Sequence, residues 1–258
     1  MSEITLGIIG GGQLGSMLAI AAKKLNIKTV IFCDDSDAPA QNFCDNFISG
    51  KYDDKNKISE FTNQVNVVTY EFENIPYETL NEINKLKPVL PKPSVNRLIQ
   101  HRLAEKDFIN KLNIRTTRYV SVEKKSDVEA LEDFLPGILK TTTLGYDGKG
   151  QYPINSIDEL NSLNIDFSKG YILEKLVKLK KEISIIITRF NNLKYEIYEP
   201  IENTHEDQIL KYSKIPADIN DKIFNQSKEW ATLIAEELKY IGTLCIELFI
   251  DRNDNLYV

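Results

Sequence analysis

The chain contains few of the residues that mark secreted, zinc-binding or membrane-spanning proteins. Its 258 residues include three cysteines, which are far apart and form no Cys-x-x-Cys pair. An odd, scattered set of cysteines favours neither a disulfide framework nor a zinc site. No apolar run approaches the ~18 residues of a membrane span, and no basic leader precedes residue 4. We therefore expect a cytoplasmic protein that does not bind membranes.

Positive charge is also in short supply. The chain has 32 Lys and Arg residues against 38 Asp and Glu residues, and its net charge is -6. Such a balance offers no extended cationic field for nucleic acid or anionic lipid. A hydrophobic content of 42% can fill the core of one large domain or two modest ones. We expect a small-molecule ligand and no nucleic-acid partner.

The first third of the chain alternates short β-rich runs with helical runs, which predicts a parallel sheet covered by helices. The predicted strands are residues 4–10, 28–34 and 65–71, and the predicted helices are residues 13–26 and 76–86. Apolar residues in the first helix recur at three- and four-residue spacing, which predicts the stripe that packs on the sheet. The stripe consists of Leu14, Met17, Leu18, Ala21, Ala22 and Leu25.

Three prolines, Pro88, Pro91 and Pro93, interrupt both patterns and predict a domain junction. We expect one domain at residues 1–93 and a second at residues 94–258. The second begins with a predicted helix over residues 94–113, with Ser94 as its N-cap. Longer strands and one amphipathic helix follow, which predicts an α+β domain with a mainly antiparallel sheet.

Gly10, Gly12 and Gly15 form a Gly-x-Gly-x-x-Gly pattern between a predicted strand and a predicted helix, with Asp34 about 20 residues further on. One interpretation is a nicotinamide or flavin site. The physical content of the pattern is a tight turn whose helix N–H groups face an anion. A phosphorylated sugar fits that description as well as a pyrophosphate does.

A second glycine-rich stretch follows Lys140, which ends a short apolar run. It contains Gly145, Gly148 and Gly150. A plain turn is one interpretation, because glycine adopts backbone angles that strain other residues. The other is a flap over phosphates, with Lys140 and Lys149 supplying charge. It is not a Walker A loop, because Lys149 is followed by glycine and not by Ser or Thr.

Near the end of the chain, strict alternation over residues 242–251 predicts a strand with two distinct faces. Leu244, Ile246, Leu248 and Ile250 share one face, and Glu247 lies on the other between Cys245 and Phe249. A carboxylate on a largely apolar surface needs a partner. That partner is either a salt bridge or a magnesium ion, which binds hard oxygen ligands. Glu174 and Glu182 raise the same question.

Seven ordered blocks together resemble the carboxyaminoimidazole ribonucleotide synthase family, whose members are ATP-grasp enzymes of purine biosynthesis. The resemblance runs from residue 6 to residue 258. The blocks are GIIGGGQLGSML, YEFENIP, HRLAEKDFINKL, ILKTTTLGYDGKGQ, YILEKLVKLKKEIS, ENTHEDQIL and IGTLCIELFI.

The resemblance implies an α/β and α+β fold: an ATP-grasp domain at residues 94–258 behind a Rossmann-like, substrate-binding N-terminal domain at residues 1–93. It implies that ATP and bicarbonate form carboxyphosphate, whose carboxyl unit passes to the amine of 5-aminoimidazole ribonucleotide. It also implies a magnesium cofactor and a homodimer.

The resemblance further implies which residues bind ATP. Arg102 and Lys140 match phosphate-contacting residues, Glu182 matches a ribose-binding carboxylate, and His205 lies in a nucleotide-contacting block. The flap that closes over the triphosphate comprises Gly145, Tyr146, Asp147, Gly148, Lys149, Gly150 and Gln151. The adenine-binding hinge comprises Glu174, Lys175, Leu176 and Val177.

For the second substrate, the resemblance implies contacts from Gly12, Gln13, Leu14 and Glu73, joined by Tyr146 and Lys149 of the flap. Tyr146, Asp147 and Lys149 are the candidate catalytic residues. Asp147 is the candidate for proton handling on the attacking amine. Glu247 matches a magnesium ligand.

The chain departs from the family pattern in two places. Leu144 stands where the family usually has glycine, and Thr142 stands where it often has arginine; Leu144 is expected to stiffen the flap. The family also continues past residue 258 with a second metal carboxylate and a small C-terminal domain. We therefore expect a fragment or an incomplete metal site with poor turnover. The alternatives are a nucleotide-binding fragment without turnover and an NAD(P)-dependent oxidoreductase built on the N-terminal glycines.

Overall fold

The computed structural model describes residues 4–124, 127, 131–144, 150–191, 194–206 and 209–258. The chain divides into two compact units, Met1–Arg97 and Leu98–Val258. Within the described ranges, no helix is both long enough and apolar enough to cross a bilayer.

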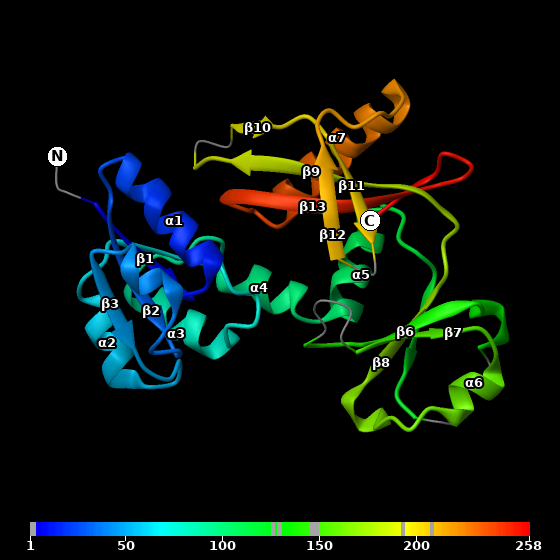
Figure 1. Ribbon diagram of the computed structural model, residues 1–258, viewed down its shortest axis with the longest axis horizontal. Helices are drawn as coiled ribbons and strands as arrows, with labels where there is room; N and C mark the ends of the chain where they lie inside the picture. The colour runs from blue at the N-terminus through cyan, green and yellow to red at the C-terminus, as the bar shows by residue number, and fades with distance from the viewer. Residues whose placement is uncertain (1–3, 125–126, 128–130, 145–149, 192–193, 207–208) are drawn as a thin grey trace. The chain divides into compact units, whose positions relative to one another are not determined.

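The first unit contains a four-stranded parallel sheet in the order β3-β2-β1-β4 (Figure 1). Its strands are β1 (Thr5–Ile9), β2 (Lys28–Cys33), β3 (Asn46–Ser49) and β4 (Val67–Tyr70). Its helices are α1 (Gln13–Lys24), α2 (Lys55–Thr62) and α3 (Tyr77–Leu86), and α4 (Pro93–Ile99) follows. The predicted alternation of strand and helix is confirmed.

Helices cover both faces of this sheet. Alternate residues of each strand therefore pack in two different hydrophobic cores. Ile9 and Phe32 pack with residues of α2 and α3, such as Phe61. The neighbouring Ile8 and Ile31 pack with Ala19 of α1. Strands buried on both faces are typical of a parallel sheet in an α/β fold.

The prediction for the inner face of α1 was wrong. The residues that face the sheet are small: Gly15, Ser16, Ala19 and Ala22 are buried. Of the predicted stripe only Ala22 is buried; Leu14 and Met17, for example, are 55% and 58% exposed. A Cβ at Gly15 would lie 2.8 Å from the carbonyl oxygen of Gly10. Because α1 approaches the preceding turn this closely, only a residue without a side chain fits at Gly15. The face of α1 that includes Gly15 is therefore buried, and the larger apolar residues lie on the exposed face.

The second unit begins with α5 (Arg102–Lys111) and contains two sheets. The smaller has the order β5-β8-β6-β7 and is antiparallel. Its strands are β5 (Tyr119–Val122), β6 (Gly137–Thr141), β7 (Gln151–Ile154) and β8 (Tyr171–Lys175), and α6 (Ile157–Ser162) follows β7. Leu139 and Leu173 bury one face in a core, which leaves Lys140 and Glu174 on the other.

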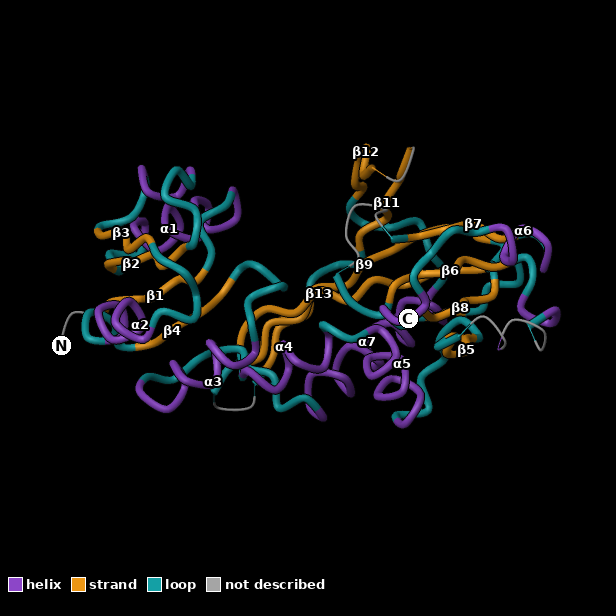
Figure 2. Tube along the Cα trace, turned by 90° about the horizontal axis from the view of Figure 1, so that it is seen from below, coloured by secondary structure: helices purple, strands orange, loops and turns teal. Residues whose placement is uncertain are grey.

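The larger sheet has the order β12-β11-β9-β13-β14, with β10 also paired to β9. Figure 2 labels its strands β12, β11, β9 and β13. Its strands are β9 (Leu179–Arg189), β10 (Tyr195–Ile197), β11 (Ile201–Glu206), β12 (Ile209–Lys214), β13 (Gly242–Asp251) and β14 (Leu256–Tyr257). Helix α7 (Asp221–Glu237) packs against β9 and β13. Ile246, Leu248 and Ile250 are buried, which confirms the predicted inner face of β13.

The single helix predicted over residues 94–113 is two helices. Helix α4 starts at Pro93, so Ser94 lies inside its first turn and is not an N-cap. Helix α5 starts at Arg102 after His101 adopts an extended conformation with φ -124°. Ring nitrogen Nδ1 of His101 accepts a hydrogen bond from the Ala104 N–H at 3.4 Å. The break places Arg102 at the beginning of a new helix.

Candidate functional site

The glycine-rich turn between β1 and α1 is built around the carboxylate of Glu71. Gly10 has φ +105°, and a Cβ there would lie 2.7 Å from Glu71 Oε1. The backbone N–H of Gly12 donates to the same oxygen at 3.1 Å. Glycine is needed here both for the backbone angle and for the close approach.

Glu71 comes to this turn because β4 and β1 are parallel neighbours. Ile9 pairs with Tyr70, so the residues that follow the two strands meet at one edge. The N–H of Glu71 donates to the Ile9 carbonyl oxygen at 3.1 Å. Burial raises the pKa of Glu71 above its ordinary value, and the hydrogen bond from Gly12 offsets part of that rise.

Glu71 is a candidate that sequence reasoning missed. Within the block Tyr-Glu-Phe-Glu the predicted substrate contact was Glu73, which is exposed, whereas Glu71 is half-buried against the glycines. One signal in the sequence could have identified it. The glycine turn lies at the end of the predicted strand that became β1, and Glu71 lies at the end of the one that became β4; residues that follow neighbouring parallel strands meet at the same edge of the sheet. Gln13 and Leu14 lie at the start of α1 and are exposed.

A cluster of buried charges lies on the face of the small sheet that points away from its core. Lys140 Nζ in β6 is 2.9 Å from Glu174 Oε2 in β8, and Lys106 Nζ in α5 is 3.6 Å from Glu174 Oε1. The side chains of Lys106, Lys140 and Glu174 are 14%, 15% and 8% exposed. Thr117 joins the cluster: its hydroxyl accepts from Lys106 Nζ at 3.1 Å and donates to Glu174 Oε2 at 3.3 Å.

These charges shift the pKa values of Glu174 and Lys106. Burial alone would raise the pKa of Glu174, but Lys140 and Lys106 outweigh it and hold that pKa below its ordinary value. Burial lowers the pKa of Lys106, and the attraction of Glu174 opposes that change. Arg102 also favours the ionised form of Glu174. The surrounding cations thus favour the ionised form of Glu174 although its side chain is buried.

Arg102 is positioned by the start of α5. Its backbone N–H donates to the Thr142 carbonyl oxygen at 2.9 Å, which ties the helix start to the chain just after β6. Sequence reasoning placed Arg102, Lys140 and Glu174 in one nucleotide site from three separate blocks. The structure brings all three to one cluster and adds Lys106, whose only sequence signal is its place in the block that contains Arg102.

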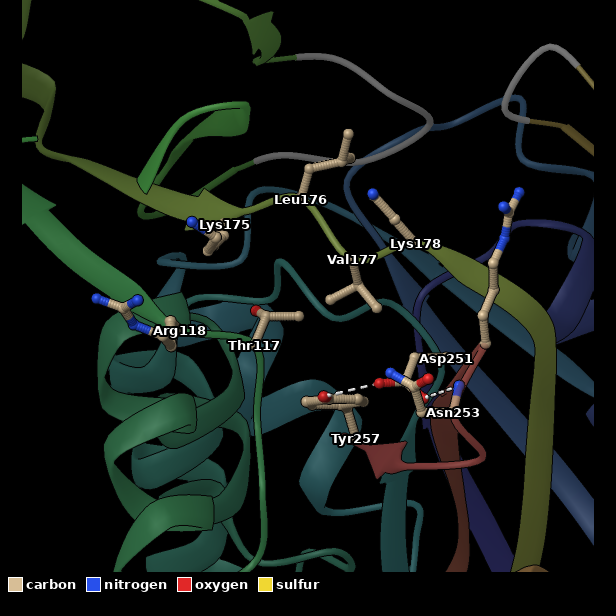
Figure 3. Close-up of a pocket in the computed structure, with 10 residues that line it drawn as sticks. Thr117, Arg118, Lys175, Leu176, Val177, Lys178, Asp251, Asn253 and Tyr257 are labelled. Carbon is tan, nitrogen blue, oxygen red and sulfur yellow. Dashed lines mark hydrogen bonds between the residues drawn. The ribbon is translucent and has the colours of Figure 1, made fainter. Parts of the chain in front are cut away.

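A cavity of about 570 Å³ opens beside the end of β8 (Figure 3). Three of the four predicted hinge residues line it: Lys175, Leu176 and Val177. Thr117 and Tyr257 also line it. In Figure 3 the side chain of Val177 points toward the side of Tyr257, whereas that of Leu176 points away. The fourth hinge residue, Glu174, belongs to the charge cluster described above.

Two further predicted nucleotide contacts meet on the larger sheet. His205 Nδ1 in β11 lies 2.7 Å from Glu182 Oε2 in β9. The two side chains are 34% and 30% exposed, so solvent and ligands can reach both. An isolated histidine in the sequence gives no hint of this contact. Only the family resemblance predicted that His205 and Glu182 bind the same nucleotide.

The expectation that Glu247 lies on a largely apolar surface was wrong. Glu247, Cys245 and Thr243 are exposed on the outer face of β13. Glu247 pairs in register with Ser184, and Phe249 pairs with Glu182. The carboxylate of Glu247 is therefore open to solvent and needs no buried partner. The same face carries Glu182 on the neighbouring strand.

The predicted residues Gly145, Tyr146, Asp147, Gly148 and Lys149 lie outside the described residues. The chain on each side is described. Leu144 is 73% exposed with φ +58°, a strained angle for leucine. Gly150 has φ +70°, and its carbonyl oxygen accepts from the Thr141 N–H at 3.0 Å. Gln151 pairs with Lys140, so the segment connects β6 to β7.

Comparison with known proteins identifies the family. The protein-family model of the ribonucleotide synthetase preATP-grasp domain matches residues 3–100, and that of the ATP-grasp domain matches residues 107–258. The N5-carboxyaminoimidazole ribonucleotide synthase of Staphylococcus aureus (strain COL) is 35% identical over 257 residues, which cover 98% of this chain and 68% of the relative. The chain belongs to the N5-carboxyaminoimidazole ribonucleotide synthase family of ATP-grasp ligases.

Solved structures of this family share the fold. The Staphylococcus aureus N5-carboxyaminoimidazole synthetase complexed with ADP has a TM-score of 0.92 at 35% identity and covers 99% of this chain and 69% of its own. The Thermus thermophilus N5-carboxyaminoimidazole ribonucleotide synthetase has a TM-score of 0.90 at 30% identity and covers 98% of this chain and 69% of its own. The predicted ATP-grasp fold and the predicted family are confirmed, and the oxidoreductase alternative is excluded.

Proposed function

We propose that the chain uses ATP and bicarbonate to carboxylate the amine of 5-aminoimidazole ribonucleotide, giving N5-carboxyaminoimidazole ribonucleotide. The observation that carries the proposal is the largely buried pair of Lys140 and Glu174, with Arg102 acting on the same carboxylate, in a chain of this ligase family. A nucleoside triphosphate needs concentrated positive charge, and this cluster offers it next to a cavity of about 570 Å³.

In the proposed nucleotide complex, Lys140 and Arg102 neutralise phosphate oxygens. The hinge Glu174–Val177 receives the adenine through the cavity beside it. Glu182 accepts hydrogen bonds from the ribose hydroxyls, since a carboxylate has two oxygens for a hydroxyl pair. His205, 2.7 Å from Glu182, holds that carboxylate in place and contacts the nucleotide.

The second substrate is assigned to the first domain, residues 1–93, while residues 94–258 form the ATP-grasp domain. Gly12, Gln13 and Leu14 present the start of α1 to the ribonucleotide phosphate, as helix N-termini suit anions. Glu73 and, from its geometry, Glu71 receive polar groups of the same substrate. An ionised Glu71 with a raised pKa is well suited to accept hydrogen bonds from a bound ligand.

In the proposed reaction, a bicarbonate oxygen attacks the terminal phosphorus of ATP, and ADP leaves. The amine of the ribonucleotide then attacks the carbon of carboxyphosphate, phosphate leaves, and the amine loses a proton. We assign that proton to Asp147, with Tyr146 and Lys149 beside the reacting atoms. The segment Gly145–Gln151 excludes water, because carboxyphosphate otherwise hydrolyses.

Magnesium fits the outer face of β13 only together with a nucleotide. Glu247 offers one exposed carboxylate there, and among the described residues no three His, Cys, Asp or Glu side chains cluster as a ready metal site. Magnesium commonly binds one or two carboxylates plus substrate phosphates. A bound magnesium ion would supply positive charge to the phosphates during transfer.

We also propose a homodimer in the cytoplasm, where ATP and purine precursors are found. The family resemblance is the support for the dimer. Light scattering coupled to size-exclusion chromatography measures it directly: a dimer should elute with a mass near twice 29.5 kDa, and a monomer at all concentrations would contradict this part of the proposal.

The reaction is tested by measuring ADP release with all three substrates and with each omitted in turn. We expect slow ADP release that requires both bicarbonate and 5-aminoimidazole ribonucleotide. Lys140→Ala should reduce this ADP release to background, because a charge-assisted contact to the transferring phosphate is lost. Lys111→Ala, at the exposed end of α5, is the control and should leave the rate unchanged. ADP release that is independent of the ribonucleotide would contradict the proposed second substrate.

A further inference from the structure

Two lysines on different structural elements form ion pairs with Glu174. Lys140 belongs to β6 and lies 2.9 Å from Oε2, whereas Lys106 belongs to α5 and lies 3.6 Å from Oε1. The two lysines therefore approach different oxygens of one carboxylate. Thr117 bridges Lys106 and Glu174 through its hydroxyl.

Binding of phosphate to Lys140 creates a conflict if Lys140 is the only partner of Glu174. An ammonium shared with a phosphate cannot give the same compensation to a carboxylate that is 8% exposed. A buried carboxylate that loses its partner is strongly unfavourable. The nucleotide would then bind more weakly, because the free energy of the ion pair between Lys140 and Glu174 would be lost on binding.

We propose that Lys106 is a positioning residue that keeps Glu174 compensated, so that Lys140 can leave it for the phosphates of the nucleotide. The inference rests on the proposed function. Lys106 acts through Glu174 and Lys140 and touches no phosphate itself. In the structure, Lys106 is held in place by its hydrogen bond to Thr117 and by the burial of its side chain, which is 14% exposed.

The alternative is that Lys106 only anchors α5 to the small sheet. The two roles differ in how a loss of Lys106 combines with a loss of the Glu174 charge. If Lys106 serves to compensate Glu174, removing its charge matters only while Glu174 is ionised. If Lys106 is merely an anchor, the effect on nucleotide binding is the same whether residue 174 is Glu or Gln.

The test is a double-mutant cycle on the binding of Mg-ADP, measured by isothermal titration calorimetry on the 258-residue chain. The variants are Lys106→Met, Glu174→Gln and the combination of both. We expect Lys106→Met to weaken Mg-ADP binding by about tenfold or more in the wild-type background. In the Glu174→Gln background the same change should alter the dissociation constant by no more than about twofold.

Two controls complete the experiment. Lys111→Met makes the same substitution at the exposed end of α5 and should bind Mg-ADP as the wild type does. If Lys106→Met does not fold, Lys106→Gln keeps a donor for Thr117 without the charge and takes its place in the cycle.

Equal weakening in both backgrounds, or no weakening in the wild-type background, would overturn the role of Lys106. A wild-type protein that binds no Mg-ADP would instead overturn the proposed function, so the two failures are distinguishable.

Discussion

Glu174 lies at the centre of the proposed nucleotide site, and its ionisation links that site to the stability of the fold. The pKa of Glu174 is lowered because Lys140 and Lys106 outweigh the effect of burial. The folded protein therefore binds a proton at Glu174 less readily than the unfolded chain does. The ionised form of Glu174 stabilises the fold above the ordinary carboxyl pKa of 4.5, and this contribution is lost as the pH falls below it.

Comparison of wild type with Glu174→Gln tests this linkage. The free energy of unfolding, measured in urea, should be lower for Glu174→Gln at neutral pH. The difference between the two proteins should shrink as the pH falls toward and below 4.5, because protonation removes the charge that the variant lacks. A difference that stays constant with pH would contradict the assigned ionisation.

Glu71 is expected to behave in the opposite way. Its pKa is raised by burial, so its ionised form opposes folding above the ordinary carboxyl pKa. Glu71→Gln should therefore raise the melting temperature at neutral pH and lose this advantage in acid. It should also weaken binding of 5-aminoimidazole ribonucleotide, measured by calorimetry. A variant that binds the ribonucleotide as tightly as the wild type would remove Glu71 from the substrate site.

At the scale of single residues, short motifs predict only part of the site. A family resemblance placed Lys140, Arg102 and Glu174 together, because Lys140 and Glu174 are 34 positions apart and nothing local pairs them. Lys106 was missed, since a lysine on an amphipathic helix looks like a solvated one. Glu71 was passed over for Glu73, because the choice depends on which residue directly follows a strand.

At the scale of elements, helix α5 carries Arg102 and Lys106, and its N-cap is the imidazole of His101. His101 accepts a long hydrogen bond of 3.4 Å from the Ala104 N–H. A carboxylate at this position caps a helix better and also interacts favourably with its N-terminal dipole.

His101→Asp should therefore raise the free energy of unfolding by roughly 0.5–1 kcal/mol, measured by urea denaturation at neutral pH. His101→Ala serves as the comparison and should not raise it. If Asp and Ala destabilise the protein equally, His101 is not the cap that sets the start of α5.

The elements also show which patterns determine structure. In strand β13 the predicted faces are observed. Side chains of a strand point alternately to its two faces, so burying Ile246, Leu248 and Ile250 fixes which residues lie on each face. In α1 the larger apolar residues did not predict the buried face. The glycine turn requires close packing at Gly15, and that local contact overrides the apolar stripe.

At the scale of the whole molecule, the two compact units divide the proposed work. The unit Met1–Arg97 holds the glycine turn and Glu71, and the unit Leu98–Val258 holds the charge cluster, Glu182 and Glu247. Alternation of strands and helices predicted the parallel sheet of the first unit. The longer strands of the second unit likewise predicted an antiparallel α+β arrangement, which the structure confirms. Its division into two sheets, with the proposed nucleotide contacts on faces turned away from the cores, depends on long-range strand pairing that no short stretch of sequence encodes.

The most direct test of the central claim is titration of the folded chain with Mg-ADP in a calorimeter, alongside Lys140→Ala. The wild type should bind one equivalent of nucleotide with measurable heat, and Lys140→Ala should bind at least about tenfold more weakly. A well-folded wild-type chain that gives no binding heat, or a Lys140→Ala variant that binds equally well, would contradict the account.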